Sequence, residues 1–226
     1  MIKAELFERS AVRCIEKATN GGLKAGQLGL LTSKKGLGKT SVLVQFGLDD
    51  LFKGKQVFHV SFAQQSSYMI SWYQDIFAEI AKKKNISNVS ELLDEVVQKR
   101  VILNFNQDAV TLDQVVKTVK ALAESGIKAN SILVDGVDFS KVSADSLKVV
   151  ADYAKENNIS VWFSASSDSD VIADTLSSEL EPLFACVLHL AQKSDSVELQ
   201  ALKLPEGSAN TLSVRLDSKT LLMTEK

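Results

Sequence analysis

Residues 28–40, LGLLTSKKGLGKT, determine how the first half of the chain is expected to fold. The apolar run at 28–31 predicts a buried strand. A glycine-rich turn follows it and leads into a stretch in which Leu43, Phe46 and Leu51 recur at helical spacing. These residues therefore predict a strand, a tight turn and a helix in direct succession.

The same alternation of strand and helix continues along the chain. Apolar runs predict strands, and stretches with helical periodicity lie between them. The predicted strands are 57–62, 101–105, 131–135 and 160–164, and the predicted helices are 66–83, 89–99, 111–125 and 144–156. Strands that are apolar throughout are typical of a mostly parallel sheet that is covered by helices on both faces. The sequence therefore predicts an α/β fold with a mostly parallel central sheet flanked by helices.

The two ends of the chain have a different character. Helical spacing at 4–19 predicts a first helix that ends before Gly21 and Gly22. Near the other end, four short strand-like runs predict an antiparallel extension on one edge of the sheet, at 184–190, 196–203, 211–216 and 219–223. No proline-rich or glycine/serine-rich linker divides the sequence, so we expect a single domain. Its parts would be an N-terminal helix, a core and C-terminal antiparallel strands, at 1–20, 21–190 and 191–226.

Composition excludes several classes of protein. The 226 residues include 26 Lys or Arg and 28 Asp or Glu, which gives a net charge of −2, and 45% of the residues are hydrophobic. This excludes intrinsic disorder, and it provides no overall attraction for nucleic acid, which we do not expect as a partner. Cys14 and Cys186 match no metal-ligand spacing. No signal sequence and no apolar run of about 18 residues is present, so we expect a cytoplasmic protein without a membrane span.

The turn at 33–40 matches the phosphate-binding pattern G-x-x-x-x-G-K-[ST], except that Ser33 stands at the first glycine. Gly36 and Gly38 allow the backbone to direct its N–H groups at an anion, and the helix start adds partial positive charge. We expect Lys39 to reach the terminal phosphates of ATP or a related nucleotide. The predicted nucleotide-binding residues are Ser33, Lys34, Lys35, Gly36, Leu37, Gly38, Lys39, Thr40 and Ser41.

Asp135 is the second predicted element of the site. It ends the apolar run at 131–135, and the carboxyl ends of parallel strands form the rim at which α/β sheets bind ligands. There its carboxylate could hold Mg²⁺ through water. Together with the hydroxyl of Thr40, Asp135 predicts a magnesium site beside the bound phosphates.

With these motifs the chain resembles the RecA-like ATPases, in particular the branch that holds the KaiC clock proteins and the DnaB-type helicases. The resemblance covers roughly residues 20–223. It rests on GGLKAGQ at 21–27, the turn at 33–40, GKQV at 54–57 and Asp135. It implies a central parallel sheet, ATP with Mg²⁺, and often ring or filament assembly, so that a protein partner or a second copy of the chain is expected.

The chain departs from this family at three positions that support hydrolysis. Ala63 stands where the family usually has its glutamate base, and Ala165 stands where a polar sensor is common. The family's K-x-R near the end is reduced to Lys203, which is a candidate to act on a neighbouring subunit. Gln64 and Gln65 remain as candidates to orient a water molecule. Loss of a base and of an arginine finger lowers rates by orders of magnitude.

These departures lead to one main hypothesis and two alternatives. The main hypothesis is a nucleotide-dependent regulatory or assembly factor with weak or absent ATPase activity. The alternatives are an active ATPase that drives a partner or polymer, and a scaffold that keeps the fold without binding nucleotide.

The turn is also similar to the variant loop of MinD/ParA-type ATPases, in which a lysine near the loop start contacts phosphate across a dimer. We interpret Lys34 and Lys35 instead as solvated charges beside a polyanion site. In that family the loop lies near the start of the chain, and the lead and tail of the RecA-like pattern are absent.

Overall fold

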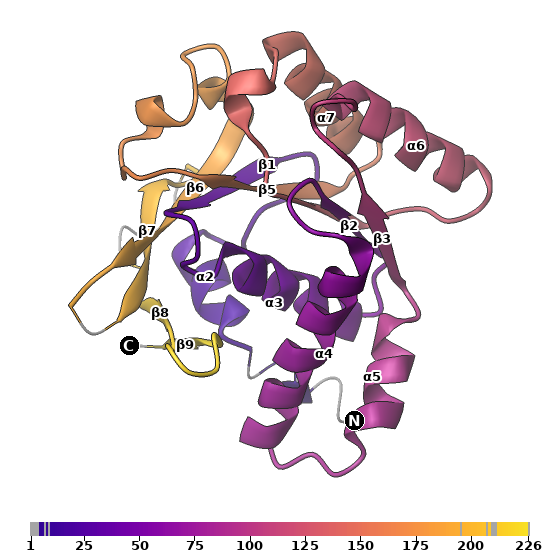
Figure 1. Ribbon diagram of the computed structural model, residues 1–226, viewed down its shortest axis with the longest axis vertical. Coiled ribbons are helices and arrows are strands. Elements are labelled where there is room, and N and C mark those ends of the chain that lie inside the picture. Colours follow the sequence, from indigo (N-terminus) through magenta and orange to yellow (C-terminus); the bar gives the residue numbers. More distant parts are fainter. Residues whose placement is uncertain are drawn as a thin grey trace.

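The computed structural model describes residues 5, 6, 8, 10–194, 196–206, 208 and 212–225. In this part of the chain, nine strands form one sheet in the order β3-β2-β4-β5-β1-β6-β7-β8-β9 (Figure 1). The strands are β1 Leu28–Ser33, β2 Val57–Ser61, β3 Arg100–Asn104, β4 Ser131–Asp135, β5 Ser160–Ser166, β6 Phe184–Gln192, β7 Val197–Lys203, β8 Val214–Leu216 and β9 Met223–Glu225.

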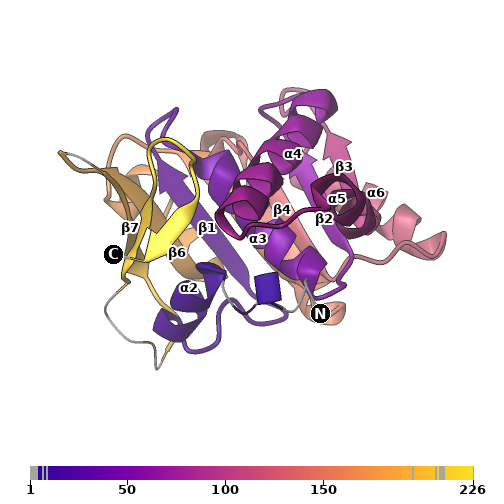
Figure 2. The same cartoon turned by 90° about the horizontal axis from the view of Figure 1, so that it is seen from below.

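Helices cover both faces of the sheet and make a three-layer α/β/α arrangement (Figures 1 and 2). One face carries α2 Val12–Ala18, α3 Lys39–Phe52, α4 Ser66–Lys83 and α5 Val89–Val97. The other face carries α6 Leu112–Glu124 and α7 Ala144–Glu156. Short 3₁₀ turns at 139–141, 172–174 and 181–183 lie in the connections. The predicted α/β class, with a mostly parallel sheet flanked by helices, is confirmed.

The parallel part of the sheet runs from β3 to β6, and the antiparallel part consists of β7, β8 and β9. The C-terminal antiparallel strands are therefore confirmed, but the first of the four predicted runs is placed differently. Residues 184–190 form part of β6, which pairs parallel to β1. The long connection at 167–183 carries the chain back to the edge of the sheet at which β1 begins. Only from there can β6 run parallel to β1.

The helix predicted over 4–19 is interrupted at Ser10. Glu5, Leu6 and Glu8 are helical, and α2 begins only at Val12. The Ser10 side chain accepts a hydrogen bond from the Val12 backbone N–H at 3.3 Å. Such local side-chain bonds compete with the helical pattern, which explains why the apolar spacing alone predicted one helix without a break.

The strand predicted at 219–223 is wrong except at Met223, because Lys219 and Thr220 lie in a turn. The Asp217 carboxylate accepts hydrogen bonds from the backbone N–H groups of Lys219 and Thr220, at 3.1 and 2.8 Å. Leu221 follows with a φ of 56°, and β9 begins at Met223. The run predicted at 211–216 is described from residue 212, and its strand, β8, is confined to Val214–Leu216.

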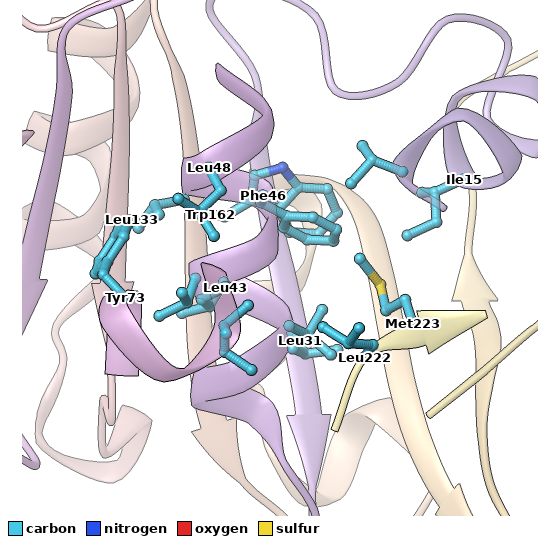
Figure 3. Close-up of a cluster of buried hydrophobic side chains, with 14 of the residues drawn as sticks. Ile15, Leu31, Leu43, Phe46, Leu48, Tyr73, Leu133, Trp162, Leu222 and Met223 are labelled. Atoms are coloured by element: carbon cyan, nitrogen blue, oxygen red, sulfur yellow. The ribbon is translucent and has the colours of Figure 1, made fainter. Parts of the chain in front are cut away.

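The core beneath α3 holds the turn at 33–40 in place. Leu43 and Phe46 of α3 point towards the sheet, where Phe46 packs on Trp162 with ring centroids 5.0 Å apart (Figure 3). Leu222 and Met223 from the C-terminal end lie against the same cluster. Burial on this scale makes the position of α3 rigid, since a well-packed core tolerates little displacement.

The strand order switches direction at the carboxyl end of β1. From β1 the chain passes through α3 to β2 on one side, and it later reaches β6 on the other side. Ligands of open α/β sheets bind at such a switch in strand order, outside the carboxyl ends of the strands. The turn at 33–40 lies at this point.

Candidate phosphate-binding site

The turn between β1 and α3 contains two glycines in a left-handed backbone conformation. Gly36 and Gly38 have φ values of 87° and 98°, a region that glycine adopts without steric cost. Gly38 directly precedes the first turn of α3. The free N–H groups at the start of this helix therefore lie next to the turn. A Cβ built at Gly36 would meet no atom within 4 Å. Gly36 is therefore open on the side that a Cβ would occupy.

Lys39 is held by the turn itself. Its ammonium donates to the carbonyl oxygens of Ser33 and Lys34, at 3.1 and 3.2 Å, and to the Ser33 hydroxyl at 3.2 Å. Burial lowers the pKa of Lys39, and the nearby Asp135 carboxylate opposes this shift. The charge that the sequence predicts for phosphate binding thus lies within the turn.

Thr40 and Asp135 are brought together as the sequence predicts. The Thr40 hydroxyl donates to Oδ2 of Asp135 at 2.8 Å, although 95 positions separate the two residues. Because the Thr40 proton points at the carboxylate, the lone pairs of its oxygen remain available to a cation. Asp135 is 2% exposed, so its position is fixed by the surrounding sheet.

The donor set at this edge fits magnesium only when phosphate is also present. A hydroxyl and a carboxylate are hard oxygen donors, and Mg²⁺ is usually bound by one or two carboxylates together with substrate phosphates and water. Among the described residues, no group of three or more His, Cys, Asp or Glu side chains could hold a metal ion. Thr40 and Asp135 would therefore hold Mg²⁺ as part of a complex with a nucleotide, in which the ion neutralises phosphate charge.

Ser33 and Ser41, two further predicted nucleotide-binding residues, also make internal contacts. Ser33 is fully buried, and its hydroxyl donates to the Lys34 carbonyl at 2.7 Å, so its side chain lies within the turn. The Ser41 hydroxyl donates to the Leu221 carbonyl at 2.7 Å and thereby binds the C-terminal segment. Lys34, Lys35 and Gly36 are exposed, whereas Leu37 and Gly38 are half-buried.

Ala63, which stands at the base position, lies beside Gly136, the residue after Asp135. A Cβ built at Gly136 would overlap the Ala63 side chain, which places Ala63 next to the residue that follows Asp135. Gln64 is fixed through its backbone, because its N–H donates to the Ser61 hydroxyl and its carbonyl accepts from Asn104. Gln65 is exposed and precedes α4.

At the sensor position the structure brings a different residue to the site. Ala165 is buried in the core under α6 and α7. The preceding residue, Ser164, donates from its hydroxyl to Oδ1 of Asp135. Sequence reasoning missed Ser164, although β4 and β5 end side by side and their pairing, Val134 with Phe163, places Ser164 next to Asp135.

Lys203 lies at the end of β7, where it is bound within its own chain. Its ammonium donates to the Glu181 carbonyl at 3.0 Å, and a Glu181 carboxylate oxygen is 4.0 Å away. A role on a neighbouring subunit would require Lys203 to leave these contacts.

His189 is a further polar residue near the turn. It lies opposite Thr32 in the pairing of β6 with β1, and its Nδ1 is 2.8 Å from the Thr32 hydroxyl oxygen. Burial lowers the pKa of His189; the Asp170 carboxylate opposes the shift and the Lys39 charge adds to it. The pairing of strands so distant in sequence is not visible from local patterns.

A cavity of about 420 Å³ lies away from the turn, between α2, the end of α4 and β9. Its lining includes Cys14, Phe52, Ile80 and Met223. The candidate site at the turn does not coincide with this cavity.

The chain matches no model of a known protein family, and no curated protein is significantly similar to it in sequence. Among the helices of the described residues, none combines the length and the apolar character needed to cross a bilayer.

Proposed function

We propose that this chain binds ATP or a related nucleotide with Mg²⁺ at the turn 33–40 and acts as a nucleotide-dependent regulatory or assembly factor of the RecA-like type. The observation that carries the proposal is the contact between Thr40 and Asp135 at 2.8 Å, next to a glycine-rich helix start. Phosphate, magnesium and a basic side chain would meet there, as nucleotide binding requires.

We propose further that hydrolysis is slow or absent. The methyl group of Ala63 lies beside the Asp135 edge and cannot accept a proton from an attacking water. Ala165 is buried, and Lys203 is engaged with Glu181. In this proposal nucleotide binding, rather than turnover, changes how the protein interacts with a partner or with further copies of itself.

A second candidate, a scaffold that binds no nucleotide, is favoured by one observation. The three hydrogen bonds of Lys39 to Ser33 and Lys34 satisfy its ammonium without a phosphate. Nucleotide binding would have to replace these bonds with stronger, charge-assisted ones.

A thermal unfolding titration with ATP and MgCl₂ distinguishes the two candidates. At a concentration about 100 times the dissociation constant, the ligand adds about 2.7 kcal/mol to the free energy of unfolding. We expect this gain for the natural chain and its loss in Lys39→Ala, while Lys148→Ala, an exposed lysine on α7, keeps it. No change in the natural chain at millimolar ATP would favour the scaffold.

Phosphate release then tests the second part of the proposal. We expect a turnover well below the order of 1 s⁻¹, the lower end of ordinary enzyme rates. A turnover at or above that value would identify an active ATPase instead.

A further inference from the structure

Ser164 lies in the sheet, next to Asp135 of the candidate site. It belongs to β5, which lies between β1 and β4 in the sheet, so that it is between the strand of the turn and the strand of Asp135. Its pairing partner in β1 is Leu31, and its side chain is fully buried. Ser164 is therefore buried in the sheet between the strand of the turn and the strand of Asp135.

The hydrogen bonds of Ser164 determine where its proton points. Its oxygen accepts the backbone N–H of Gly136 at 2.9 Å, and its hydroxyl donates to Oδ1 of Asp135. A hydroxyl has a single proton to donate. Because the Gly136 bond uses a lone pair, the proton is committed to Asp135.

The Asp135 carboxylate consequently has one donor on each oxygen. Thr40 donates to Oδ2 from α3, and Ser164 donates to Oδ1 from β5. Two donors on two different elements fix the plane of the carboxylate, which one donor alone would leave free to rotate.

From this geometry we infer that Ser164 is a positioning residue, which orients Asp135 for the Mg²⁺ that accompanies the nucleotide. This inference rests on the proposed function. Partners behind a metal-binding carboxylate typically change metal affinity by about 10–100-fold when they are removed. Removal of Ser164 would leave Oδ1 of Asp135 and the N–H of Gly136 without these bonds, inside a buried part of the sheet.

The experiment measures how strongly ATP binding depends on Mg²⁺. Equilibrium dialysis with ATP is carried out over a range of MgCl₂ concentrations and also in EDTA. We expect Ser164→Ala to need about 10–100 times more Mg²⁺ for half-maximal binding, with binding in EDTA unchanged. Ser166→Ala, which changes an exposed serine on the same strand, serves as the control and should behave like the natural chain.

Two additional variants separate positioning from a general loss of structure. Ser164→Cys keeps a weaker donor and should give an intermediate Mg²⁺ requirement, at temperatures where circular dichroism shows both variants folded. In an Asp135→Asn background, Ser164→Ala should change the Mg²⁺ requirement by less than about twofold, because the group on which it acts has been altered.

The outcomes distinguish this inference from the proposed function. If the natural chain binds ATP with Mg²⁺ and Ser164→Ala has the same Mg²⁺ dependence, the inference is overturned and the proposed function stands. An equal loss of binding with Mg²⁺ and in EDTA also overturns it, since the role would then be structural. If the natural chain binds no ATP, the proposed function fails, and the inference fails with it.

Discussion

His59 lies in the middle of β2 with its side chain fully buried. Its Nδ1 is 3.1 Å from the Tyr73 hydroxyl oxygen, and its Nε2 has no hydrogen-bond partner within the described part of the chain. Burial lowers the pKa of His59 to about 4; the Asp135 carboxylate opposes this shift and the Arg100 charge adds to it. His59 is therefore neutral in the folded protein near pH 7.

The lowered pKa of His59 predicts that the fold loses stability in mild acid. Between pH 6.5 and about 4 the unfolded chain takes up a proton at this residue that the folded chain does not. The free energy of unfolding should fall with falling pH through this window, by up to about 1.4 kcal/mol per pH unit from this group. Urea unfolding at a series of pH values measures the slope.

His59→Leu should weaken the dependence of the free energy of unfolding on pH in this window, because the titrating side chain is removed. Tyr73→Phe keeps His59 and removes only the hydroxyl, so its slope should remain steep. If the free energy of unfolding changes with pH equally in the natural chain and in His59→Leu, His59 has the same pKa in the folded and unfolded states, and the prediction is wrong.

At the scale of single residues, sequence could predict those whose role follows from a local motif. Thr40 and Asp135 meet as expected, because one begins a helix and the other ends a strand at the same edge. Ser41 and Ser164 could not be assigned in this way. Their roles depend on Leu221 and on the neighbouring strand, which are brought close only by the pairing of the whole sheet.

At the scale of elements, the first two turns of α3 are hydrogen-bonded to the C-terminal end of the chain. The Gln45 amide donates to the Leu221 carbonyl at 3.0 Å and accepts the Met223 backbone N–H at 2.7 Å. Ser41 donates to the same carbonyl. The helix that begins at the candidate site therefore also holds β9 in place. Met223 of β9 and the preceding Leu222 pack on the core (Figure 3).

Gln45→Leu should loosen β9 while leaving the volume of the side chain nearly unchanged. The buried Met223 N–H would lose its acceptor, at a cost of about 1–3 kcal/mol in the free energy of unfolding. Hydrogen exchange should become faster at residues 221–225. The control is Gln74→Leu, at an exposed position of α4, for which the free energy should change by less than about 0.5 kcal/mol. Unchanged hydrogen exchange at residues 221–225 in Gln45→Leu would contradict the role of Gln45 in holding β9.

Most elements could be predicted from apolar periodicity, and two of the errors have local causes. The helix predicted over 4–19 is interrupted at Ser10, and the strand predicted over 219–223 is displaced by the turn at Asp217. In both places a side chain hydrogen-bonds to nearby backbone. Periodicity records which side chains are apolar, and it contains no information on such bonds.

At the scale of the whole molecule, strand order places the turn at the point where the chain switches direction across the sheet, at the carboxyl end of β1. The sequence predicted a parallel sheet, because its strands are apolar throughout, but the order of strands was not predicted. The parallel pairing of β6 with β1 depends on contacts across more than 150 positions. Periodicity describes one segment at a time, so it could not show that residues 184–190 close the parallel part of the sheet.

The most direct test of the central claim is the amount of ATP bound per chain at saturation, measured by equilibrium dialysis with MgCl₂. We predict one ATP per chain for the natural protein and none for Lys39→Ala at the same concentrations. No bound ATP in the natural protein, or equal binding by Lys39→Ala, would contradict the claim that the turn at 33–40 holds a nucleotide.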